Sequence, residues 1–266
     1  MTEWKPLTAR ITFLPTSAMF PAGASPLEMF RAIFLQDPQA FNKQTNPLAA
    51  SSAQGLIDGI KVNLVCAIPR VDINFAPGAK PGADEDSSAF STIESAPDLQ
   101  KLLLKSIESV GGALSLRAAR VAVAIQFVSL VSSVREANGI FQSVVPRQYS
   151  LKLEDEDDFV FQVNTPFVSK SVASVSLNFV RNWSTVRFQV LNFAVAANAG
   201  YPPVVFGDSS HAMGPQTSIG ASVNFEVNNV PTLEPISIEN QRLILLESLS
   251  TIQVGQRETG LNVEGF

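Results

Sequence analysis

The residue types that could perform catalysis are sparse in this chain, and the densest group surrounds its single histidine. His211 follows Asp208, Ser209 and Ser210 in the stretch FGDSSHAMGP, so the types of a serine–histidine–aspartate relay are neighbours in sequence. Neighbouring residues point in different directions, whereas such relays are assembled from distant segments. The glycine-flanked turn that presents a nucleophilic serine is also missing. We therefore expect a polar surface loop here rather than a catalytic relay.

The only cysteine, Cys66, could form a thiol–imidazole pair with His211 and with no other residue. It falls on the apolar alternation of Val62, Leu64 and Ile68, where a cysteine behaves as a small buried hydrophobic residue. A single cysteine excludes an internal disulfide, and a single histidine excludes a zinc site built on several imidazoles. We expect Cys66 to belong to the core.

Carboxylates offer two further candidate sites. Residues 154–158, EDEDD, could attract Ca²⁺ or Mg²⁺, but they lack the spacing and the glycine of a calcium loop, and we expect a solvated turn. Asp72 is the one acid placed in the middle of a strand, and with Glu226 it would make the pair of carboxylates that a glycosidase needs. We expect both to lie instead on a solvated sheet face. Glycine-rich phosphate-binding motifs are absent from the sequence. We therefore assign no catalytic residue, no metal and no cofactor.

The composition of the chain points to contacts with other proteins. Hydrophobic residues make up 45% of the 266 residues and charged residues only 16%, below the roughly 25% of typical soluble domains. A partner protein or a second copy of the chain would cover such a surface, and uncharged polar side chains are the alternative. The net charge of −5 and the lack of Lys/Arg runs argue against binding to nucleic acid.

The apolar segments are too short or too interrupted to direct the chain into a membrane. The first 13 residues carry Glu3, Lys5 and Arg10 and lack the apolar core of a secretory signal. The most apolar window, 121–131, is far shorter than the roughly 20 residues of a membrane span. We expect no membrane association and a cytoplasmic location.

The strongest local pattern lies in residues 172–193, VASVSLNFVRNWSTVRFQVLNF. Val175, Leu177 and Phe179 alternate with polar residues, and Val186 and Phe188 do so again further along. Alternation with a period of two is typical of strands with one buried face. We interpret the segment as a β-hairpin with its turn at 181–184, which places Trp183 at the hairpin tip. There its ring is either tucked under a loop or exposed as an anchor for a partner.

Helix-capping signals and further alternations mark the other elements. Serines that can cap helices precede periodic apolar residues at Ser25, Ser95 and Ser237, and Gly255 should end the last helix. Segment 135–145 is a helix or a loop, and 41–53 reads as a surface loop. Strands are expected at 9–14, 121–131, 148–153, 159–164 and 221–227, and the apolar run 60–75 is either one bulged strand or two strands broken at Pro69.

Together these patterns predict an α+β fold: a twisted antiparallel sheet with about three helices packed on one face. An apolar–Asn–Phe triplet recurs at 73–75, 177–179, 191–193 and 223–225, with Thr12, Gln126 and Arg187 as the middle residues of variants. This recurrence suggests two similar tandem halves, 1–112 and 113–255, followed by a tail at 256–266. The alternative is chance similarity between strands.

For function, we predict a non-enzymatic binding or assembly component that acts through another protein chain or as a homo-oligomer. The expected binding surfaces are the loops 84–86 and 197–220 and the sheet face that the helices leave open, which is lined by Asn74, Ser176, Asn178, Gln189 and Asn224. The candidate partner-binding residues are the hairpin residues Trp183, Arg181, Arg187 and Asn178, and the candidate loop residues are Asp84, Asp86 and His211. Two alternatives stay open: a structural subunit of a larger particle, and an enzyme of unrecognised type that uses scattered carboxylates or His211.

Overall fold

The computed structural model describes residues 3–16, 25–44, 50–78, 90–145, 159–190, 195–196, 204–205, 216–261, 263 and 265–266. The first half of the chain contains β1 (Lys5–Pro15), α1 (Pro26–Phe34), β2 (Ala40–Gln44), β3 (Ala50–Ile57), β4 (Ile60–Ala67), β5 (Arg70–Pro77) and α2 (Ala96–Glu108). The second half contains β6 (Ala118–Val131), α3 (Val134–Val144), β7 (Val160–Val168), β8 (Ser176–Val190), β9 (Val195–Ala196), β10 (Val204–Val205), β11 (Gln216–Asn229) and α4 (Ile238–Glu258). Within these residues, the fold is thus mixed, with four helices.

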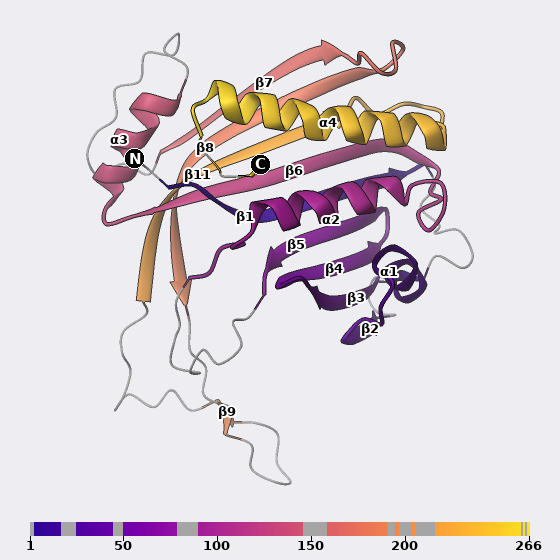
Figure 1. Ribbon diagram of the computed structural model, residues 1–266, viewed down its shortest axis with the longest axis horizontal. Helices are drawn as coiled ribbons and strands as arrows, with labels where there is room; N and C mark the ends of the chain where they lie inside the picture. The colour runs from indigo at the N-terminus through magenta and orange to yellow at the C-terminus, as the bar shows by residue number, and fades with distance from the viewer. Residues whose placement is uncertain are drawn as a thin grey trace.

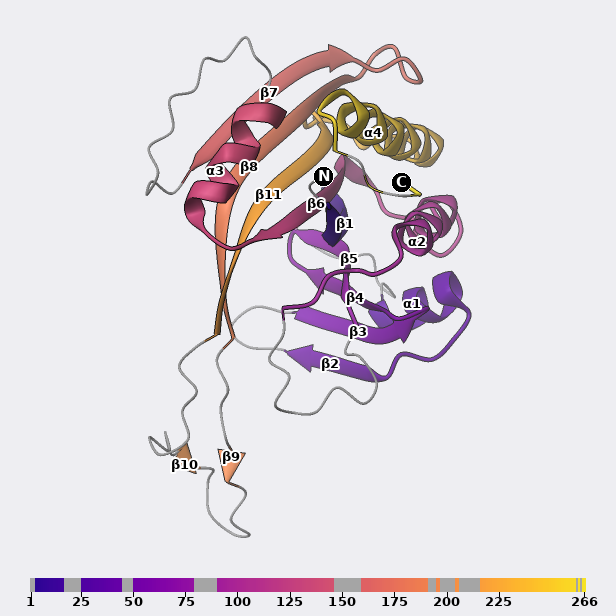
Figure 2. The same cartoon turned by 60° about the vertical axis from the view of Figure 1, so that its left-hand side comes forward.

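Nine strands form one antiparallel sheet in the order β2-β3-β4-β5-β1-β6-β11-β8-β7 (Figure 1). β9 pairs with β10 separately (Figure 2). The predicted α+β fold with an antiparallel sheet is confirmed. β1 and β6 pair at the centre, with Ile11 opposite Val123. The strands of the first half lie on one side of this pair and those of the second half on the other, so the centre of the sheet depends on contacts between distant parts of the chain.

Serine side chains cap three of the helices, at Ser95 and Ser237 as expected and at Ser133, which was not predicted. The hydroxyls of Ser95, Ser133 and Ser237 accept hydrogen bonds from backbone N–H groups three residues further on, at the starts of α2, α3 and α4. α1 begins at Pro26, whose fixed φ suits the first helical position, and Ser25 makes no side-chain cap bond. Segment 135–145, which the sequence left open between helix and loop, is therefore helical.

The main core lies between the helices and one face of the sheet. α1 packs on β3 and β4, α2 on β1, α4 on β6 and β11, and α3 on β8 and β11 (Figures 1 and 2). Odd-numbered residues of the central strands point to these helices and are fully or almost fully buried, among them Ile11, Phe13, Val123, Ile125, Phe127, Val223, Phe225 and Val227. Because the alternating apolar residues of adjacent strands lie on the same face of the sheet, they form a continuous apolar layer.

Gly255 does not end the last helix. α4 continues to Glu258, and a Cβ at Gly255 would clash with the ring of Phe179 on β8. The glycine therefore allows close packing of helix on sheet. The segment expected as a tail is also part of the fold, because Leu261 and Val263 are buried and the Phe266 ring packs edge-on against Phe127.

The predicted hairpin at 172–193 is wrong. β8 runs without a turn from Ser176 to Val190 and pairs along its length with β11, with Trp183 opposite Val223. The apolar residues have odd numbers before Arg181 and even numbers after Thr185. This change in the alternation resembles the pattern of two strands joined by a turn. Trp183 is fully buried, so the odd-numbered face stays buried through the middle, whereas Val186 and Phe188 lie on the opposite face.

Two other segments also differ from or refine the expectation. Part of 41–53, expected as a surface loop, forms β2 and β3, which pair with each other near one edge of the sheet. Strands with so few apolar residues show no clear alternation of apolar and polar positions, and the sequence therefore did not predict them. The run 60–75 divides into β4 and β5 at Ile68–Pro69, which settles the alternative that the sequence left open. None of the described helices combines the length and the apolar composition needed to cross a membrane.

The side chain of Glu247 on α4 holds the connection between β7 and β8. Its carboxylate accepts hydrogen bonds from the Ser169 hydroxyl at 2.6 Å and from the backbone N–H groups of Lys170 and Ser171 at 2.8 and 3.1 Å. Burial alone would raise the pKa of Glu247, but these hydrogen bonds outweigh burial and hold the pKa below its ordinary value. The ionised carboxylate therefore stabilises the fold.

We expect Glu247→Gln to lower the free energy of unfolding by about 1–2 kcal/mol at pH 7, with solvent screening keeping the loss modest. Because the folded-state pKa is lowered, this contribution is present above the ordinary carboxyl pKa of about 4.3 and is lost as the pH falls through the folded value. Urea denaturation at pH 7 and pH 3 should therefore show a difference that shrinks in acid. Glu258→Gln, at an exposed position on the same helix, serves as the control and should shift stability by less than about 0.5 kcal/mol.

Candidate functional site

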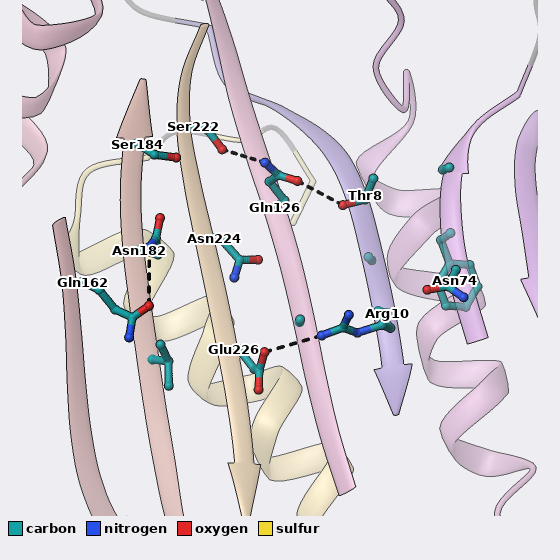
Figure 3. Close-up of a pocket in the computed structure, with 15 residues that line it drawn as sticks. Thr8, Arg10, Asn74, Gln126, Gln162, Asn182, Ser184, Ser222, Asn224 and Glu226 are labelled. Atoms are coloured by element: carbon teal, nitrogen blue, oxygen red, sulfur yellow. Dashed lines mark hydrogen bonds and ion pairs between the residues drawn. The ribbon is translucent and has the colours of Figure 1, made fainter. Parts of the chain in front are cut away.

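A polar hollow of about 540 Å³ lies on the sheet face opposite the helices (Figure 3). Its lining comes from β5, β1, β6, β11, β8 and β7, and the helices lie behind the sheet in this view. The polar side chains that line it are Thr8, Arg10, Asn74, Gln126, Gln162, Asn182, Ser184, Ser222, Asn224 and Glu226. We take this hollow as the candidate functional site in the described part of the chain.

Five of these side chains form one row across five neighbouring strands. The pairing registers place Gln162 on β7 opposite Asn182 on β8, Asn182 opposite Asn224 on β11, Asn224 opposite Gln126 on β6, and Gln126 opposite Thr8 on β1. Paired residues share a face of the sheet, and adjacent strands lie about 4.8 Å apart. The result is a line of four carboxamides and one hydroxyl at right angles to the strands.

The hydrogen bonds along this row stop on either side of Asn224. The Thr8 hydroxyl donates to Gln126 Oε1 at 3.3 Å, and Gln126 Nε2 donates to Ser222 Oγ at 2.9 Å. On the other side, Asn182 Nδ2 donates to Gln162 Oε1 at 3.5 Å. The half-buried Asn224 lies between these groups and makes no side-chain hydrogen bond to any described residue (Figure 3). Its amide has two donors and an acceptor available to a ligand.

The carboxylate of Glu226 lies between two arginine side chains beside the row. Glu226 lies 3.6 Å from Arg10 Nη2 and 3.7 Å from Arg120 Nη2, and its Oε1 accepts a hydrogen bond from Asn228 Nδ2 at 2.8 Å. All three charged side chains are between 23% and 37% exposed. The two arginines are thus committed to a carboxylate of the protein, and the hollow presents a mainly uncharged, hydrogen-bonding surface.

The predicted partner-binding residues divide between the two faces. Asn178 lies on the face of the hollow, where it bonds Asn164 and Asn228. Arg181 lies on the helix side, where Nη2 donates to Thr165 Oγ1 at 3.0 Å and the guanidinium lies 5.2 Å from the centre of the Phe179 ring. Arg187 falls in the same register phase as Arg181.

Trp183 is not the exposed anchor that the hairpin model placed at its tip. Its indole is fully buried, with its ring centre 5.7 Å from that of Phe161 on β7. A side chain without solvent exposure cannot contact a partner in this conformation, so Trp183 is a core residue. The loop candidates Asp84, Asp86 and His211, and the acidic run 154–158, lie outside the described residues.

Cys66 is buried in the core, where desolvation, and then the charge of Asp72, raise the pKa of its thiol to about 12. The thiol is therefore protonated at neutral pH, which agrees with the expected core role.

Asp72 and Glu226 both lie on the open face, but β1 and β6 separate their strands. Three strand spacings amount to roughly 14 Å, beyond the roughly 6.5–9.5 Å between the carboxyl groups of inverting glycosidases. Asp72 instead pairs with Arg70 and accepts a 2.6 Å hydrogen bond from Thr12.

The sequence did contain a signal for the row. The middle residues of four apolar–Asn–Phe triplets or variants, Asn74, Gln126, Asn178 and Asn224, face the open side, while their apolar neighbours face the core. The triplets were interpreted as a sign of duplication, and Asn74, Asn178 and Asn224 were also expected on a polar sheet face open to water or to a partner. Gln126 was not placed on that face. Gln162, Asn182 and Ser184 lie outside the triplets, so only the strand register brings these residues to the hollow.

Within the described residues, no group of three or more His, Cys, Asp or Glu side chains is arranged to hold a metal ion. A scan against protein-family models, a search of curated proteins and a search of solved structures each returned no match. The case for a function therefore depends on the geometry of the site.

Proposed function

We propose that the protein is a non-enzymatic binding component whose open sheet face engages another protein chain. The observation that carries the proposal is the polar row of the hollow, in which Asn224 has hydrogen-bonding groups that no described residue satisfies. Buried polar groups are normally paired, and a surface that leaves them open gains most from a ligand that pairs with them.

The charges of the hollow favour a protein partner over nucleic acid. Phosphate recognition draws on cations that are available to the ligand, whereas Arg10 and Arg120 face Glu226. The net charge of −5 and the low charged content support the same choice. A second copy of the chain is one form that the partner can take.

The proposal retains three finer expectations. One is that the helices cover a single face and leave the other for binding, and the placement of α1, α2, α3 and α4 supports it. Another is duplication, supported by the order strand, helix, antiparallel strands, helix in β1–α2 and again in β6–α4. The last is a cytoplasmic setting, supported by the free thiol of Cys66.

The test is a pull-down from the native host combined with light scattering of the purified protein. We expect the wild type to retain a stoichiometric partner or to self-associate, and Asn182→Arg to abolish the complex because it places a long cation in the row. Asn42→Arg is the matched control, since Asn42 is exposed on β2 at the far end of the sheet.

A monomer of 28.6 kDa with no partner, or a complex that both arginine variants retain, would contradict the proposal. A closed assembly of many copies that Asn182→Arg leaves intact would instead favour the structural-subunit alternative.

A further inference from the structure

The hollow has the shape of a trough across the strands. Its lining extends from Asn74 on β5 to Gln162 on β7, across six neighbouring strands. At about 4.8 Å between strands this is a length of about 24 Å. Along the strands, the lining of β11 covers only three alternating positions, Ser222, Asn224 and Glu226, a width of about 14 Å. An elongated occupant fits this outline better than a compact one.

The chemistry of the trough suits an occupant that alternates donors with acceptors and carries no charge. Amides and hydroxyls both donate and accept, and the Arg10–Glu226 pair leaves little net charge. The side chain of Phe75 belongs to the core, so no aromatic ring is presented among the lining residues of the trough. Sugar rings usually pack their apolar faces on aromatic side chains, which makes an oligosaccharide a poorer match.

We infer that the trough binds an extended, uncharged segment of polypeptide that crosses the strands and pairs a backbone amide with Asn224. An extended chain advances about 3.4 Å per residue, so about seven residues fill the length of the trough. Each peptide unit has one N–H and one C=O, and the carboxamide of Asn224 offers the complementary acceptor and donors. This inference rests on the proposed function and names the chemistry of the partner.

Asn224 is the expected centre because its neighbours in the row are already engaged. Gln126 bonds both Thr8 and Ser222, and Asn182 bonds Gln162. A bound peptide can therefore pair with Asn224 without breaking a hydrogen bond of the protein. The hydrogen bonds of Gln126 and of Asn182 keep the side chains on either side of Asn224 in place. Binding therefore costs little side-chain conformational entropy.

The experiment is selection from a phage-displayed library of random heptapeptides on the immobilised full-length protein, followed by affinity measurements with the enriched peptides as synthetic compounds. We expect enriched sequences poor in Asp, Glu, Lys and Arg. Asn224→Leu, which keeps the approximate volume but removes the amide, should weaken their binding about tenfold or more. Asn42→Leu, the same change outside the trough, should leave binding unchanged.

A second measurement tests recognition of the backbone. N-methylation of the central residue of an enriched peptide removes one N–H and should weaken binding to the wild type but have little further effect on Asn224→Leu. Circular dichroism checks that both variants remain folded. The inference is overturned if no peptide is enriched, if enriched peptides bind Asn224→Leu as tightly as the wild type, or if N-methylation at every position is tolerated.

Two other probes separate the competing ligand classes. Maltoheptaose represents neutral oligosaccharides and a thymidine dodecamer represents single-stranded nucleic acid. Binding of either one that Asn224→Leu abolishes, without peptide enrichment, would overturn the inference. If the host partner is lost in Asn182→Arg but retained in Asn224→Leu, the proposed function holds and this inference fails.

Discussion

Trp183→Ala is expected to lower the free energy of unfolding by about 3–5 kcal/mol, the usual cost of removing a large aromatic side chain from a core. The indole is fully buried on the helix-covered face of β8 and packs beside Phe161 of β7. Because β7 is an edge strand that pairs with β8 alone, the cavity should also loosen the attachment of β7. Urea denaturation followed by circular dichroism measures the loss.

The same variant separates the core role of Trp183 from the role of an exposed anchor. An anchor on a hairpin tip would lose partner binding at unchanged stability, whereas the continuous strand predicts a large loss of stability. Phe41→Ala is a suitable control because Phe41 is 44% exposed on β2, and we expect a change within about 0.5 kcal/mol. A Trp183→Ala protein as stable as this control would contradict the burial of the indole.

The helices could be predicted because their signals are local. A serine that caps the first turn, a proline at the first helical position and an apolar stripe all lie within one segment, as at Ser95 and Pro26. The end of α4 could not be predicted in the same way. Gly255 is a stop signal by its type, but its function here is to make room for Phe179, which comes from a strand more than 70 residues earlier.

Strands were predicted correctly where the buried residues keep to odd numbers throughout, as from Val121 to Phe127. The prediction was wrong where the apolar residues change from odd to even numbers, as in β8. In β8 the burial of Trp183 maintains the odd-numbered face, while Val186 and Phe188 are apolar residues on the other side. A sequence cannot distinguish this arrangement from two strands and a turn when polar residues occupy the middle. Arg181, Asn182 and Ser184 supply that polarity, although no glycine or proline is present to make a tight turn.

A polar sheet face that includes Asn74 and Asn224 could be predicted from the sequence, but the row of side chains across it could not, because the row depends on sheet order. Thr8 and Gln126 are separated by 118 positions in the chain, yet they share a hydrogen bond. The triplets around Gln126 and Asn224 show that each polar residue faces away from a core, but not that the two stand side by side. Adjacency of β1, β6 and β11 turns separate polar positions into one row.

Asn229, at the end of β11, links this strand to β6 through hydrogen bonds of its side chain. The side chain is fully buried, its Oδ1 accepts from the Val121 N–H at 2.7 Å, and its Nδ2 donates to the carbonyl oxygens of Ala119 and Val230 at 3.0 and 2.8 Å. It therefore bridges β11 to the start of β6. The register between these strands is the one that sets Asn224 opposite Gln126.

We expect Asn229→Ala to destabilise the protein by about 2–4 kcal/mol, because the Val121 N–H and the Val230 carbonyl lose this partner and a small cavity remains, whereas the Ala119 carbonyl keeps its hydrogen bonds from Thr232. Unlike Asn224→Leu, which should change ligand binding at nearly constant stability, Asn229→Ala should reduce both. Urea denaturation measures the stability, and hydrogen exchange at the Val121 amide should show local loss of protection. Unchanged exchange at Val121 would mean that the β6–β11 register does not depend on this side chain, and the site would then be held by backbone pairing and core packing alone.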